Sequence, residues 1–171
     1  MSKTGHQLVG IALAALAAAF CRHLGYGMVS GIAAASTAFA GSTAPDWMEI
    51  SKAVPRPQHP GMWMRRSVIP HRTVTHWALA WAVFMVWALL SLPNVTADLV
   101  AQTWHAAAFG FALGGIGHLI CDIPNPTGIP VLLPTAEARI SLRWWRSGST
   151  VEWFEILAFW ALGGLAWMTI L

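Results

Sequence analysis

Histidine and aspartate residues that could ligate a metal ion are scattered along an otherwise apolar chain. Two of them, His118 and Asp122, are four residues apart, so on a helix their side chains lie one turn apart on the same face. An imidazole and a carboxylate in that arrangement can bind one cation. Further candidates occur near the ends of other apolar segments. The full set of predicted metal ligands is His6, Asp46, His71, His76, His118 and Asp122.

The composition that surrounds these residues is that of a membrane protein. Of the 171 residues, 56% are hydrophobic and only 10% are charged, and the mean hydropathy is +0.56, which is too apolar for an ordinary soluble domain. A helix needs about 20 largely apolar residues to cross the hydrocarbon core of a bilayer. The sequence therefore predicts one all-α membrane domain over residues 1–171, a polytopic bundle of about five transmembrane helices. The predicted spans are 6–22, 28–45, 74–92, 103–122 and 152–171.

Basic residues set the expected orientation, because cytoplasmic loops of membrane proteins are rich in Lys and Arg. With a cytoplasmic N-terminus, every Lys and Arg except Arg22 falls on the cytoplasmic side. We therefore predict a multi-pass protein with its N-terminus inside. The net charge of +3 indicates contact with anionic membrane lipids, and it is too small and dispersed to indicate nucleic-acid binding.

The loops and one helix have further signals. Most prolines lie in residues 46–73 and 123–151, which are expected to be non-helical segments at the cytoplasmic face. Gly110 and Gly114 form a small-xxx-small pair, which allows two helices to pack closely in lipid.

This topology places the candidate ligands at one depth. His6 begins the first predicted span, Asp46 follows the second, His76 enters the third and Asp122 ends the fourth, all on the cytoplasmic side. An ionisable group at the interface costs less than one at the bilayer centre, so each residue alone says little. The shared depth and the spacing of the last pair together favour a metal site at the cytoplasmic interface. The remaining histidines are interpreted as interfacial or hydrogen-bonded residues: His23, His59 and His105.

Short motifs around these residues resemble the YdjM-type family of predicted membrane-bound metal-dependent hydrolases. They are Gly5-His6, Pro45-Asp46, His71-Arg72-Thr73-Val74-Thr75-His76, Gly117-His118-Leu119-Ile120-Cys121-Asp122 and Asn125-Pro126-Thr127-Gly128-Ile129-Pro130. The resemblance covers residues 5–134 and implies an inner membrane protein with a divalent metal that acts as a hydrolase. Family members often have a second Asp two residues after the first, followed by His, where this chain has Met48 and Glu49. Either Glu49 substitutes as a ligand or base, or the site has fewer metal contacts.

The chemistry expected from these residues is hydrolysis at one or two divalent ions. Mixed nitrogen and oxygen ligands suit zinc or manganese, and such an ion lowers the pKa of a bound water. Glu49 or a non-ligating Asp would serve as general base, and Arg72 would neutralise a phosphate or an oxyanion. A site at headgroup depth would receive a lipid or another membrane-associated ester, and a phosphoester is the first expectation. The alternative is a non-catalytic metal-binding membrane protein or a transporter subunit.

Overall fold

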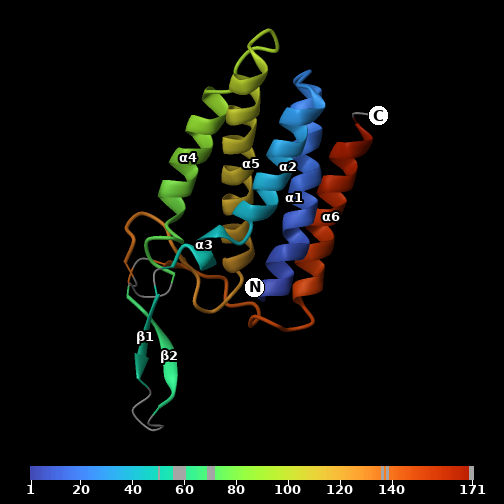
Figure 1. Cartoon of the computed structure of the whole chain (residues 1–171). Coiled ribbons are helices and arrows are strands. Elements are labelled where there is room, and N and C mark those ends of the chain that lie inside the picture. The colour runs from blue at the N-terminus through green and yellow to red at the C-terminus, as the bar shows by residue number, and fades with distance from the viewer. Residues whose placement is uncertain (50, 56–60, 69–71, 136, 138, 170–171) are drawn as a thin grey trace.

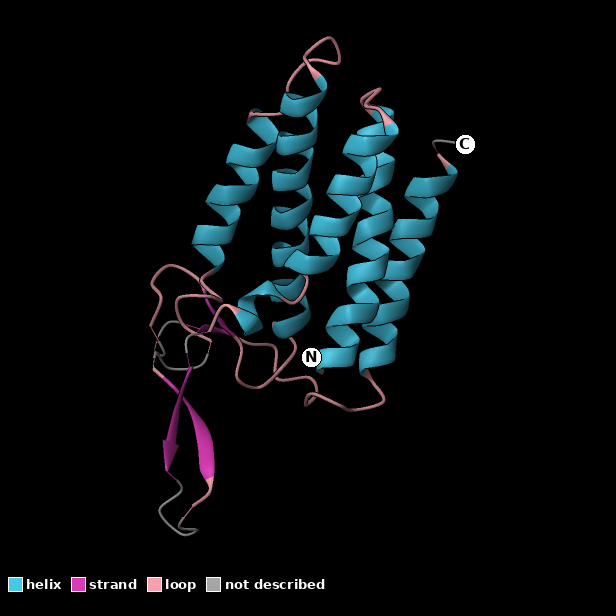
Figure 2. Ribbon diagram, viewed as in Figure 1, coloured by secondary structure: helices cyan, strands magenta, loops and turns pink. Residues whose placement is uncertain are grey.

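The computed structural model describes residues 1–49, 51–55, 61–68, 72–135, 137 and 139–169. These residues are mostly helical, with four short strands (Figure 2). The helices are α1 (Lys3–His23), α2 (Met28–Gly41), α3 (Ala44–Trp47), α4 (Ala78–Leu90), α5 (Leu99–Asp122) and α6 (Glu152–Met168). The strands are β1 (Ser51–Pro55), β2 (Trp63–Ser67), β3 (Ile129–Pro130) and β4 (Arg139–Ile140).

The long helices stand side by side, and α1 and α5 are long and apolar enough to cross a membrane (Figure 1). They have 21 and 24 residues, whereas the apolar helices α2 and α4 are shorter, with 14 and 13 residues. Each predicted span coincides with one of these helices or with α6, which has 17 residues. The prediction of a mainly helical fold is therefore confirmed.

Two antiparallel strand pairs lie in the segments that were expected to be non-helical. In the first, β1 pairs with β2, and Lys52 lies opposite Arg66. In the second, β3 pairs with β4 across two residue pairs. The β1–β2 hairpin extends away from the helices at the end where α3 lies (Figure 1).

Helices α2 and α5 pack with their backbones in close contact. A Cβ added at Gly110 would overlap the carbonyl oxygen of Ala34, and one added at Gly114 would overlap that of Ala38. Both alanines are fully buried. The predicted role of the small-xxx-small pair is thus met, because only glycine lets the two helices approach this closely. This packing fixes the last turns of α5 against the segment that follows α2.

Candidate metal centre

The predicted metal ligands come from separate elements and meet at one end of the helices. His6 lies in the first turn of α1, which begins at the Ser2 N-cap. Asp46 lies in α3, and His76 lies two residues before α4. The other two, His118 and Asp122, belong to the last turns of α5. Of the predicted ligands, one lies outside the described residues: His71.

Two imidazole nitrogens lie close together, and a carboxylate oxygen of Asp46 and one of Asp122 each lie near both of them. The Nε2 atoms of His76 and His118 are 3.2 Å apart. Asp46 Oδ1 lies 3.4 Å from the first of these nitrogens and 3.7 Å from the second. Asp122 Oδ2 lies 3.6 Å and 3.5 Å from the same two atoms. Tetrahedral zinc, with bonds of about 2.0–2.1 Å, has its ligand atoms about 3.3 Å apart, so the two nitrogens together with either oxygen are spaced as ligands of such an ion.

His118 is held in the tautomer that a metal requires. Its Nδ1 lies 2.8 Å from the carbonyl oxygen of Ser42, which can only accept a hydrogen bond, so Nδ1 carries a proton. In the neutral ring Nε2 then presents its lone pair to the cluster. Hydrogen bonds of this kind orient metal-binding histidines in many proteins.

His6 is buried beside this cluster without a hydrogen-bond partner. Its ring stacks on that of His118, with centroids 3.7 Å apart and an interplanar angle of 12°. Neither ring nitrogen has a hydrogen-bond partner among the described residues, and only 1% of the residue is exposed. A buried polar atom without a partner costs about 1–3 kcal/mol, and a bound cation would remove that cost. His6, His118 and Asp122 form a second group close enough to hold an ion.

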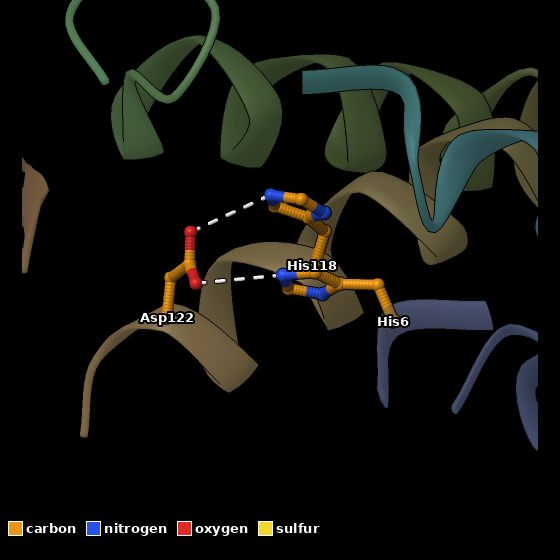
Figure 3. Close-up of side chains that lie close together, drawn as sticks. All are labelled: His6, His118 and Asp122. Atoms are coloured by element: carbon orange, nitrogen blue, oxygen red, sulfur yellow. Dashed lines mark ion pairs between the residues drawn. The ribbon is translucent and has the colours of Figure 1, made fainter. Parts of the chain in front are cut away.

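The two oxygens of Asp122 have different surroundings. Oδ1 lies 2.6 Å from the Met1 ammonium, 2.9 Å from Arg72 Nη2 and 3.5 Å from His6 Nε2. Oδ2 accepts no hydrogen bond from the described residues and faces His76 and His118. Figure 3 shows one oxygen directed at His6 and the other at His118. The ammonium and guanidinium groups at Oδ1 therefore neutralise this fully buried carboxylate, and Oδ2 stays available to a metal ion.

Arg72 is buried next to Asp122 in an unusual backbone conformation. Its φ is +57°, a left-handed value that side chains other than glycine rarely adopt and that is frequent at functional sites. The backbone N–H donates to Glu49 Oε1 at 3.0 Å. The guanidinium donates to Asp122 and to the Thr127 hydroxyl, while its Nε has no partner in the described part of the chain. The predicted anion-binding residue thus lies at the cluster with one donor unused.

Asp46 carries its charge at neutral pH. Burial alone would raise the pKa of this carboxyl, but the hydrogen bond with His76 and the nearby imidazoles of His118 and His6 lower the pKa to about 2. An ionised carboxylate is the form that binds a metal. The Asp46 side chain is 42% exposed, whereas the side chains of His76, His118 and Asp122 are fully buried.

The whole sequence matches the model of one protein family, over residues 1–171, which is described as YdjM inner membrane protein. The chain belongs to the YdjM inner membrane protein family. A search of curated proteins and a search of solved structures gave no match. The family resemblance predicted from the motifs is therefore confirmed, and the family name agrees with the two helices long enough to cross a membrane.

In this YdjM-family chain, Glu49 contacts the far side of the His76 ring. Its Oε1 lies 3.7 Å from His76 Nδ1, on the nitrogen that does not face the cluster. The Thr75 hydroxyl is nearer to the same nitrogen, at 3.1 Å, so the imidazole has both a hydroxyl and a carboxylate on its far side, where such groups orient metal-binding histidines. Met48, the other departure from the family pattern, has an exposed side chain.

Two groups that complete the cluster in the YdjM-family chain were not predicted. The Ser42 carbonyl fixes the orientation of the His118 ring. Every residue has a backbone carbonyl, so the residue type at position 42 does not predict this contact. The Thr127 hydroxyl holds Arg72 and donates in turn to Asn125 Oδ1 at 2.8 Å. Thr127 and Asn125 both lie in the motif that begins at Asn125. The sequence therefore indicated their position but not their role.

Proposed function

We propose that this protein is a membrane-bound metal-dependent hydrolase with its site at the cytoplasmic interface. The observation that carries the proposal is that the Nε2 atoms of His76 and His118 lie 3.2 Å apart and that an oxygen of Asp46 and one of Asp122 each lie 3.4–3.7 Å from both nitrogens. His6, whose ring stacks on that of His118, would be a further ligand. A zinc or manganese ion at this position would supply Lewis-acid activation of water and substrate.

A single ion fits the donor atoms better than two. His118 belongs to both groups that could hold an ion, but its Nδ1 is engaged by Ser42. Its Nε2 is then the one ring nitrogen left for a metal, and one lone pair binds one ion. We therefore favour one ion between the two groups over the two-ion site that the sequence left open.

The exposed side of the cluster supports a catalytic site. Structural zinc sites are closed by four protein ligands, whereas catalytic sites keep one position for water or substrate. The fully buried His76, His118 and Asp122 would be the three permanent protein ligands, and the half-exposed Asp46 lies at the fourth position, which water or substrate can take. Asp46 can ligate the ion or, when displaced by substrate, accept a proton. Arg72 would hold an anionic group through its unused Nε, which suits a lipid phosphoester or a related ester.

The test is metal analysis and hydrolysis on the purified protein in detergent. We expect about one zinc or manganese ion per chain and hydrolysis of a phospholipid or a generic phosphoester that chelation abolishes and added metal restores. A bound ion without hydrolysis of phosphomonoesters, phosphodiesters or carboxylic esters would instead establish the alternative, a non-catalytic metal-binding protein.

Replacing Glu49 with glutamine distinguishes a positioning role from the base predicted from sequence. Because its carboxylate contacts the far side of His76, we expect metal affinity to fall about 10–100-fold while kcat at saturating metal is kept. Metal titration followed by kinetics measures both quantities. A loss of kcat of about 10²–10⁴-fold with unchanged metal affinity would instead assign Glu49 as the general base.

We also propose that α1, α2, α4, α5 and α6 all cross the membrane, with the N-terminus in the cytoplasm. The parallel arrangement of these helices supports this (Figure 1), as does the distribution of Lys and Arg. Reporter enzymes fused after Gly25, Ser91 and Leu171 test the proposal. All three fusions should report an external location, and activity on the cytoplasmic side at any of them would contradict it.

A further inference from the structure

An apolar groove runs along α1 on the face opposite the metal centre. Ala15 lies nine residues after His6, and at about 100° per residue this is the other side of the helix. Helices α2 and α6 flank α1 and pack against it (Figure 1). Between them lies a cavity of about 560 Å³. It is lined by small side chains such as Ala15 and Ala18 on α1 and by Trp160 and Trp167 on α6.

A second cavity continues the groove to the end of α1. It has a volume of about 280 Å³ and shares Ala18, Ala35 and Trp167 with the first, so the two cavities adjoin along α1. Its far end is lined by Arg22 and Gly27. The groove extends along α1 from Ile11 to Arg22. At about 1.5 Å per residue it is about 17 Å long.

The end of the groove at the C-terminus of α1 is positively charged. Arg22 lies in the last turn of α1 with an exposed side chain, and no carboxylate of the described residues forms an ion pair with it. The N-cap of helix α2, Gly27, lines the same cavity. Glycine has no side chain that could accept a hydrogen bond from the first amides of the helix. The first amides of a helix carry partial positive charge and attract anions such as phosphate. A guanidinium and a helix N-terminus thus line the same cavity.

We propose that this groove binds one glycerophospholipid, with an acyl chain over Ala15 and Ala18 and the phosphate at Arg22. The apolar part suits a hydrocarbon chain, and the charged end complements a phosphodiester. A transmembrane helix of a second copy would leave that charge without a partner. Arg22 lies sixteen residues from His6, about 24 Å along the helix, so the bound lipid lies far from the metal centre and is not its substrate.

Native mass spectrometry of the intact protein tests this proposal. The protein is released from detergent micelles that contain phosphatidylglycerol of one chain length, and the wild type should retain one lipid per chain. Ala18→Leu places a larger side chain in the groove, and Arg22→Gln removes the phosphate contact. We expect each variant to reduce the retained lipid about tenfold. For Arg22→Gln this is the loss expected when a hydrogen bond to a charged group is removed.

Matched substitutions elsewhere control for hydrophobicity and charge. Ala82→Leu on an exposed face of α4 and Arg146→Gln in an exposed loop should retain lipid like the wild type, and all variants should keep their metal content. If Ala18→Leu loses helical circular dichroism, the lipid retention of Arg22→Gln alone tests the proposal. Equal lipid retention by the wild type and Arg22→Gln would overturn the proposal. A lipid-free dimer that depends on Ala18 would overturn it as well, in favour of a second copy.

Discussion

Replacing His118 with alanine is expected to abolish metal binding. This residue is common to both groups that could hold an ion, and its Nε2 lies within 3.7 Å of three of the other donor atoms. Its loss removes a ligand that no described side chain can replace, so affinity should fall by more than the roughly 100-fold that loss of an outer contact costs. Metal content measured by mass spectrometry after purification gives the result.

His23→Ala is the matched control for this experiment. It removes an imidazole from the exposed last turn of α1, at the opposite end of the helix from His6, and should leave metal content unchanged. Far-ultraviolet circular dichroism of both variants shows whether the helices are intact. Wild-type metal content in a folded His118→Ala protein would remove the site proposed here.

Replacing Gly114 with alanine is expected to destabilise the fold and to weaken the metal centre together. The new Cβ would overlap the Ala38 carbonyl oxygen and crowd the backbone at Gly41 and Ser42. Because these are backbone atoms, the helices must move apart, and such overpacking costs about 1–3 kcal/mol. His118 lies one turn further along α5 and is fixed by the Ser42 carbonyl, so separation of the helices should also lower metal affinity.

Gly164→Ala provides the control, because a Cβ at that position meets nothing within 4 Å. It should be neutral or slightly stabilising, since alanine favours the helix over glycine. Thermal unfolding in detergent, with and without a chelator, measures both effects. Equal melting temperatures for the two variants would mean that close contact between α2 and α5 does not stabilise this protein.

The convergence of the ligands could be predicted from the sequence, because successive antiparallel helices bring the end of one and the start of the next to the same side. His6, Asp46, His76, His118 and Asp122 all lie at one end of the helices. The conformation of Arg72 could not be predicted. Its left-handed backbone depends on the Glu49 carboxylate from another segment, and no local signal in the sequence specifies that contact.

The β1–β2 hairpin was missed for a different reason. Lys52 lies opposite Arg66, and β1 ends at Pro55. Proline within a strand opposes sheet formation, so the prolines of this segment indicated an irregular loop. The pairing became visible only in the three-dimensional structure.

The internal neutralisation of Asp122 has a consequence for how the protein acquires its metal. The guanidinium of Arg72 contacts Oδ1 directly, so the empty centre does not leave this buried carboxylate without a positive partner, the state that most strongly destabilises a protein interior. The bundle can therefore insert and assemble first and be metallated afterwards. Loading and stripping of an ion at the proposed centre should therefore be reversible in a folded protein.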